Sequence, residues 1–298
     1  MQRRTMRRTK SDVLFDTVNY SLLFLLVFLI AVPLLNIIAS SLSSVEAVMT
    51  GKVFLFPVEF SVVSYDSVFK NSQVWLGYWN SIVITIAGTI INLVLTLSAA
   101  YSLSKKDFFG RTVVMGLFTF TMLFSGGLIP SYLLVRNLKM LNTWWALIIP
   151  GAISVYNLIV AKTFFQTTIP IELHEASVLD GCNDFKFLFR IVLPLSGPII
   201  AVLTLWYAVE HWNSYFSALL FIRNEKLFPL QIILRNILIT NQVTDLSSIA
   251  LEDYVARQGL AQLLKYSLIV VASVPMFLLY PFIQKYFIQG VMVGSIKG

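Results

Sequence analysis

Residues 17–45 of the chain read TVNYSLLFLLVFLIAVPLLNIIASSLSSV, a run of 29 residues without a charged side chain. About twenty apolar residues in an α-helix are enough to cross the hydrocarbon core of a bilayer. That core holds no water, so the backbone of a crossing segment must satisfy its own hydrogen bonds, as a helix does. The run therefore predicts a helix that spans a membrane.

Five more charge-free runs follow along the chain. They lie at residues 79–103, 112–135, 143–161, 191–209 and 266–284. The sequence therefore predicts an all-α integral membrane protein with six transmembrane helices, and this even number places both termini on one side. Residues 227–239 are also apolar, but they are too few to span and include Arg235, so a surface or re-entrant helix is expected there.

The overall composition agrees with a membrane protein. Hydrophobic residues make up 57% of the chain and charged residues 12%, whereas soluble domains carry roughly a quarter charged residues. The mean hydropathy is +0.78. These values argue against a soluble enzyme, a disordered protein and a disulfide-stapled secreted domain. With Cys182 as the only cysteine, neither an intrachain disulfide nor a multi-thiolate metal site can form.

The distribution of basic residues predicts the orientation. The net charge of +7 includes five basic residues among the first ten positions, ahead of the first span. They are Arg3, Arg4, Arg7, Arg8 and Lys10. Basic flanks stay in the cytoplasm beside anionic lipid headgroups, which explains this cluster better than a nucleic-acid partner does. With both termini inside, Lys and Arg are about twice as dense in the inner connections as in the outer ones.

These spans divide the chain into three parts. Residues 1–12 form a basic cytoplasmic amino terminus, residues 13–288 a six-helix transmembrane domain, and residues 289–298 a glycine-bearing cytoplasmic tail that is expected to leave the last helix. The chain carries no phosphate-binding loop of the form G-x-x-x-x-G-K-[ST], no G-x-S-x-G and no H-E-x-x-H. The chain itself is therefore not expected to be an enzyme or to bind a cofactor.

The inner connection at residues 166–193 carries the strongest functional pattern. Residues 172–179 are expected to form a short helix with apolar Leu173, Ala176 and Leu179 on one face. Asp180 and Gly181 are expected to break it, because glycine adopts the positive φ of a tight turn. Asn183 or Asp184 can then cap a second helix at residues 185–190 before the chain returns to the membrane.

The spacing in this connection resembles the EAA loop of ATP-binding-cassette (ABC) importer permeases. That pattern is E-A-A, three residues, G, nine residues, I, any residue and L-P. The matching residues are Glu175, Ala176, Ser177, Gly181, Ile191, Leu193 and Pro194. Ser177 stands in place of alanine, and every other spacing agrees.

The resemblance extends over most of the chain. The Arg-rich start, the six spans, His211-Trp212-Asn213 and the tail from Gln289 resemble the second permease subunit of maltose-type carbohydrate importers. The segment SGGLIP at residues 125–130 is similar to the branch that handles oligosaccharides and polysaccharides such as alginate or aldouronate oligomers.

This resemblance implies a bacterial cytoplasmic-membrane complex. The partners would be a second, non-identical permease subunit, two ATPase subunits that bind ATP and Mg, an extracytoplasmic solute-binding protein, the carbohydrate and membrane lipid. The EAA loop would couple this chain to an ATPase subunit. The coupling residues would be Glu175, Ala176, Ser177, Asp180, Gly181, Ile191, Leu193 and Pro194. The alternative is an ordinary cytoplasmic connection.

Polar and aromatic residues near the end of the fifth span are candidates for a substrate pathway. They are Tyr207, Glu210, His211, Trp212, Asn213, Tyr215 and Phe216. Ionisable residues at membrane depth usually serve function, and aromatic rings can stack on sugars, but the same residues could form an interfacial belt.

The rival function is an ATP-independent secondary carrier or channel. It would need buried charges within several spans, and five of the six runs offer none. An enzyme embedded in the membrane would need a cluster of acids, bases or metal ligands, which the sequence also lacks.

Overall fold

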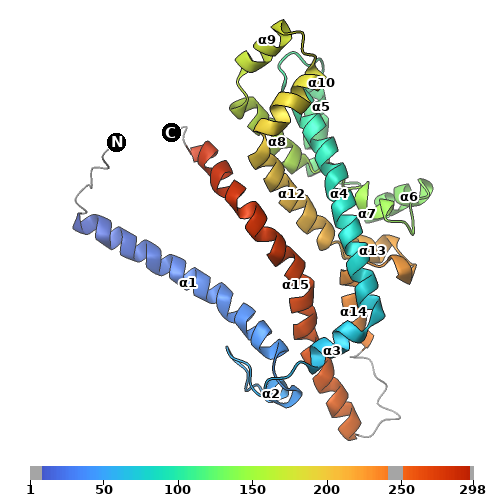
Figure 1. Ribbon diagram of the computed structural model, residues 1–298. Helices are drawn as coiled ribbons and strands as arrows, with labels where there is room; N and C mark the ends of the chain where they lie inside the picture. Colours follow the sequence, from blue (N-terminus) through green and yellow to red (C-terminus); the bar gives the residue numbers. More distant parts are fainter. Residues whose placement is uncertain (1–8, 241–250, 296–298) are drawn as a thin grey trace. The chain divides into compact units, whose positions relative to one another are not determined.

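The computed structural model describes residues 9–240 and 251–295, which are helical and contain no β-strand (Figure 1). The chain divides into two compact units. The first comprises Met1–Asn71 and Ile237–Ser273, and the second comprises Ser72–Asn236 and Val274–Gly298. The predicted all-α class is confirmed over the described ranges.

The first unit contains α1 (Lys10–Ser41), α2 (Val45–Met49), α3 (Val63–Lys70) and part of α15 (Leu251–Ser295). α1 begins with a reciprocal cap, in which the Thr9 amide donates to Asp12 Oδ2 at 2.9 Å and the Asp12 amide donates to Thr9 Oγ1 at 3.2 Å. The small core of this unit includes Ala39, Val48 and Leu263.

The second unit is built around α4 (Ser72–Ser104), which packs against α8 (Val155–Thr168) and α12 (Gly197–Trp212). The core between these helices includes the fully buried side chains of Leu158, Leu203 and Tyr207. The other helices of this unit are α5 (Arg111–Leu123), α6 (Leu128–Asn137), α7 (Trp145–Ile148), α9 (Ile171–Leu179), α10 (Asp184–Phe187), α11 (Leu193–Leu195), α13 (Phe216–Phe221) and most of α14 (Leu230–Thr240).

Within residues 9–240 and 251–295, three helices are long and apolar enough to cross a membrane. They are Lys10–Ser41, Ser72–Ser104 and Gly259–Pro281, and each covers most of a run that the sequence predicted to span. Two bent pairs could each add one span, which makes up to five by length and composition. Most of the apolar segment at residues 227–239 lies in a short helix, α14, which is too short to span a membrane. Its place at a surface or as a re-entrant helix stays a prediction.

Three predicted spans are not single straight helices. α5 and α6, in the run at residues 112–135, meet at 118° across Gly127, whose φ of +87° favours glycine. The run at residues 143–161 is split between α7 and α8, because α7 ends at Ile148 and Ser154 caps a new helix. The run at residues 191–209 bends by 84° before Gly197.

The last helix is longer than expected. α15 continues to Ser295, whereas the predicted span ended at residue 284 and a tail began at residue 289. The basic residues at positions 3–8 and the last three residues lie outside the described ranges.

Candidate functional site

The exposed connection between α8 and α12 is a bent pair of helices, as the sequence predicted. α9 ends at Leu179, and Gly181 follows with a φ of +72°. The Gly181 amide donates to the Val178 carbonyl at 3.0 Å, and the Cys182 amide donates to the Ser177 carbonyl at 2.9 Å. These bonds close the turn that the Asp-Gly pair predicted. We call residues 171–195 the elbow.

The second helix of the elbow is longer than expected. Asn183 caps it, because its Oδ1 accepts from the Lys186 amide at 2.8 Å. The chain then stays helical from Asp184 to Leu195, so the predicted end at Arg190 is wrong. A π turn at Leu188–Val192 precedes Pro194 and changes the hydrogen-bond pattern where proline has no N–H to donate.

The predicted coupling residues do not share one surface. The exposed ones are Glu175, Ala176, Asp180, Gly181 and Pro194, whereas Ile191 and Leu193 are half-buried. Ser177 is buried, and its Oγ donates to the His174 carbonyl at 2.7 Å. The third position of the motif therefore faces inward and holds a small side chain.

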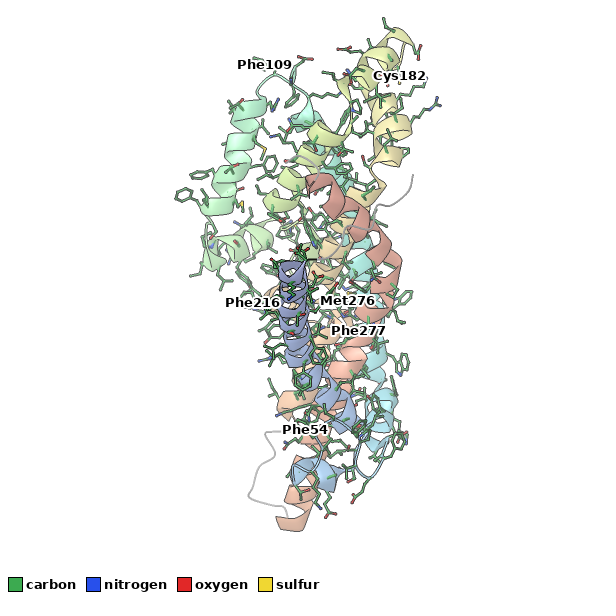
Figure 2. The ribbon with its side chains drawn as sticks, turned by 90° about the vertical axis from the view of Figure 1, so that its left-hand side faces the viewer. Phe54, Phe109, Cys182, Phe216, Met276 and Phe277 are labelled. Carbon is green, nitrogen blue, oxygen red and sulfur yellow. The ribbon has the colours of Figure 1, made fainter. Side chains whose placement is uncertain are left out.

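A carboxylate joins the elbow to the end of α4. The Tyr101 hydroxyl donates to Asp184 Oδ1 at 3.1 Å, and His174 Nε2 lies 3.1 Å from the same oxygen. Lys105 Nζ lies 3.5 Å from it. We call these four residues the Asp184 hub. Figure 2 labels Cys182 in the elbow, at the same end of the second unit as Phe109 of the α4–α5 connection.

The hub shifts the acidity of its two charged members. The hydrogen bond with His174 is the largest effect on the pKa of Asp184 and lowers it below its ordinary value. Burial, the second-largest effect, opposes this shift, while the hydrogen bond with Tyr101 and the charge of Lys105 add to it. Burial lowers the pKa of Lys105, although Asp184 acts in the opposite direction. Lys105 lies over the Tyr101 and Phe187 rings, 4.9 and 5.0 Å from their centroids, and these rings remove water from it.

The candidate pathway cluster on α12 splits into an inner and an outer group. Tyr207, His211 and Trp212 are buried. The Tyr207 hydroxyl bonds Thr96 Oγ1 at 2.6 Å, and the Asn92 side-chain amide donates to His211 Nε2 at 3.0 Å. These residues hold α12 against α4. Interhelical hydrogen bonds of this kind stabilise helix pairs in membranes.

The remaining cluster residues face outward or lie at the end of the helix. Glu210, Asn213 and Phe216 are exposed, and Phe216 is labelled in Figure 2. Tyr215 is half-buried, with the Arg235 guanidinium 5.9 Å from its ring centroid. The structure therefore does not bring the seven predicted residues to one surface.

The candidate residues predicted from the sequence do not include the α4 side of this interface. Asn92 and Thr96 supply the bonds to α12, and Gly88 makes room for the imidazole. These residues recur every three or four positions within an apolar run, so they lie along one face of the helix. That spacing was the signal that could have identified them.

Two connections at the opposite end of α4 are also held by hydrogen bonds. The Asn80 side-chain amide donates to the Lys226 and Phe228 carbonyls, both at 2.9 Å. Asn142 Oδ1 accepts from the Arg223 amide at 3.1 Å and the Asn224 amide at 2.8 Å. Among the described residues, no three His, Cys, Asp or Glu side chains lie close enough to hold a metal ion.

The chain is similar over its whole length to known transport proteins. It is 40% identical to the polygalacturonan/rhamnogalacturonan transport system permease protein YtcP of Bacillus subtilis, over 96% of this chain and 99% of that protein. It is also 40% identical to the protein LplC of the same organism, over 99% and 98% of the two chains. The arabinooligosaccharides transport system permease protein AraQ of Halalkalibacterium halodurans is 27% identical over 98% of this chain and 100% of its own length.

A solved structure has the same fold. It is a bacterial ABC transporter involved in the import of the acidic polysaccharide alginate. One of its chains is 32% identical, with a TM-score of 0.83, over 95% of this chain and 100% of that one. No family model matches the chain.

Proposed function

The chain belongs to the permease subunits of ABC sugar transporters, and from this premise we propose how it works as half of the pathway of a binding-protein-dependent importer. The observation that carries the proposal is the 40% identity to a polysaccharide permease over nearly the full length of both chains. This membership favours ATP-driven import over an ATP-independent carrier or channel.

The cargo we propose is an oligosaccharide or polysaccharide. The relatives include permeases named for polygalacturonan or rhamnogalacturonan and for arabinooligosaccharides, and the structural neighbour imports alginate. Polygalacturonan and alginate are both acidic polymers. Acidic oligosaccharides are therefore the first compounds to screen.

We propose that the chain crosses the bacterial cytoplasmic membrane six times, with both termini inside. The density of basic residues supports it, and so does the length of α4. Asn80 and Tyr101 are 21 residues apart, which corresponds to about 31 Å along a helix, close to the hydrocarbon thickness of a bilayer. The elbow would then lie inside, and the connection that Asn80 holds would lie outside.

The elbow would dock on one of two ATPase subunits, which bind ATP and Mg. Glu175 and Asp180 offer exposed carboxylates, and the Leu179 side chain is 89% exposed, so the elbow presents charge beside an apolar tip. This chain would carry no cofactor and no catalytic residue. A second, different permease subunit and a solute-binding protein would complete the complex.

The pathway would use the outer group of the α12 cluster. Glu210, Asn213, Tyr215 and Phe216 are the candidates, because they are exposed or half-buried. Tyr207, His211 and Trp212 are buried against neighbouring helices, so we assign them to packing and not to contact with cargo.

Two substitutions in the elbow test the coupling role. Glu175→Lys should weaken ATPase binding by replacing attraction with repulsion. Gly181→Val should distort the turn, because a β-branched residue at positive φ costs about 1–3 kcal/mol. Both variants should insert and pair with the partner permease, yet lose uptake and binding-protein-stimulated ATP hydrolysis together.

Each variant has a matched control in the first unit. Glu46→Lys reverses an exposed charge on α2, and Gly51→Val places valine at a φ of +68° with nothing within 4 Å. If purified complexes of the two elbow variants bind ATPase and transport as well as these controls do, the elbow is an ordinary connection.

A further inference from the structure

We propose that Asp184 is a positioning residue for coupling, because it fixes both helices of the elbow to the end of α4 so that the three move together. This inference rests on the proposed docking of the elbow on an ATPase. The family motif does not include Asp184. Its role follows from the contacts that converge on one of its oxygen atoms.

Three groups from two separate parts of the unit meet at Asp184 Oδ1. Tyr101 and Lys105 come from the end of α4 and the residue just after it, and His174 comes from α9. Their distances to this oxygen are 3.1, 3.5 and 3.1 Å. Asp184 itself is the first residue of α10. One carboxylate therefore joins α4, α9 and α10.

Aromatic rings pack against one side of the Asp184 hub. The His174 and Phe187 rings meet edge to face with centroids 5.1 Å apart, and Phe187 is 1% exposed. Phe187 lies three residues after Asp184, so both point from the same side of the helix. Tyr101, which is 8% exposed, packs against Phe187 and Phe165. The side chains that contact Asp184 are thus packed against a layer of aromatic rings.

α9 depends on these contacts because it has little core of its own. Of its nine residues only Ser177 is buried, and the apolar Ile171, Val178 and Leu179 are exposed. Its covalent links are the segment after α8 and the turn at Gly181. The Asp184 hub links α9 directly to α4. A displacement of α9 is therefore transmitted to a helix that is long enough to span a membrane.

The small contribution of the Asp184 hub to stability suits a positioning role. An exposed ion pair contributes little to stability, and the Asp184 side chain is 71% exposed. Loss of the carboxylate should therefore leave the fold intact. What should change is the orientation of the elbow, because three directional contacts are lost at once.

The test measures elbow geometry directly in the assembled transporter. Spin labels on Ile171→Cys and Lys106→Cys, in a Cys182→Ser background, report the distance between α9 and the segment after α4. Both positions are exposed. Asp184→Ala should replace one narrow distance with a broad distribution. Asp184→Asn should keep it narrow, since its amide oxygen still accepts from Tyr101 and Lys105. Glu172→Ala, which removes an exposed carboxylate from α9, should also keep it narrow.

Activity separates this inference from the proposed docking. Asp184→Ala should still co-purify with the ATPase but lose its response to the solute-binding protein, and Asp184→Asn should restore that response. Glu175→Lys should weaken ATPase binding at an unchanged distance. A narrow distance in Asp184→Ala overturns the inference even if Glu175→Lys behaves as expected. Normal ATPase binding by Glu175→Lys overturns the docking and leaves the distance result to decide the hub.

Discussion

Asn142 holds a connection through both its backbone and its side chain. Its φ of +61° lies in the left-handed region, which asparagine tolerates better than most residues. Its amide N–H donates to the Phe221 carbonyl at 2.9 Å, while its side chain accepts from the Arg223 and Asn224 amides. Two connections far apart in sequence are thereby joined.

Replacing Asn142 should destabilise this end of the unit. Asn142→Ala removes an acceptor for two amides and places alanine at positive φ, for an expected loss of about 1–3 kcal/mol. Asn142→Asp keeps an acceptor oxygen and should lose less. Thermal unfolding of the purified variants in detergent measures the difference, and equal midpoints for all three proteins would contradict the assigned role.

The Asp184 carboxylate should make a small, pH-dependent contribution to stability. Its pKa in the folded protein lies below the ordinary value of about 3.9, chiefly because His174 hydrogen-bonds to it. A depressed pKa stabilises the fold above that ordinary value, and the effect is lost as the pH falls through the folded pKa. The unfolding temperature of wild type should therefore exceed that of Asp184→Asn at pH 7, and the gap should narrow as the pH falls below that ordinary value. A gap that widens toward acid would contradict this sign.

At the scale of single elements, the pairing of α4 and α12 depends on a glycine. A Cβ at Gly88 would lie 2.7 Å from His211 Cδ2, which is closer than real side chains approach each other. The absence of a side chain there lets the imidazole reach Asn92. The two helices can pack closely because of this gap, in the way that small residues allow in membranes.

Gly88→Ala should force α4 and α12 apart and lower stability by about 1–3 kcal/mol, as overpacking does. Gly116→Ala is the matched control, since a Cβ in the middle of α5 meets nothing within 4 Å. It should be neutral or stabilising, because alanine is the better helix former. Thermal unfolding distinguishes the two variants, and equal losses would show that close approach at Gly88 is not the cause.

The sequence predicted the elements that depend on local signals. Uninterrupted apolar length identified α1 and α4, and the Asp-Gly pair with its following cap identified the turn of the elbow. The lack of charges in residues 112–135 predicted one span there and could not reveal the bend at Gly127. That bend comes from the backbone conformation of a residue within the uncharged run. The extension of the second elbow helix through Pro194 was missed because the π turn before it is not a sequence pattern.

The candidate site, too, was predicted only in part from the sequence. The EAA spacing located the exposed residues of the elbow, but it said nothing of Tyr101 or Lys105, which come from a helix about eighty residues earlier. His211 was singled out for function because it is ionisable, yet its hydrogen bond with Asn92 is seen only when α4 and α12 are placed side by side.

At the scale of the whole molecule, the six-pass arrangement predicts which residues a membrane-impermeant reagent can reach. In a Cys182→Ser background, Asn224→Cys should be labelled from outside, and Asp107→Cys only after the inner face is opened. Both native side chains are exposed, so access depends on sidedness. Labelling of the two positions from the same side would rule out this arrangement.

The two fixed ends of α4 have a consequence for how this protein can evolve. Asn80 and Tyr101 hold different connections from one continuous helix, and successive residues turn it by about 100°. Inserting one residue between them would rotate one end against the other by that angle and separate either the amide or the hydroxyl from its partner. Exposed apolar residues between them, such as Ile86 and Ile90, can therefore exchange for others, while the number of residues is held constant. The length of this segment should thus be constrained as strictly as the identity of a functional residue.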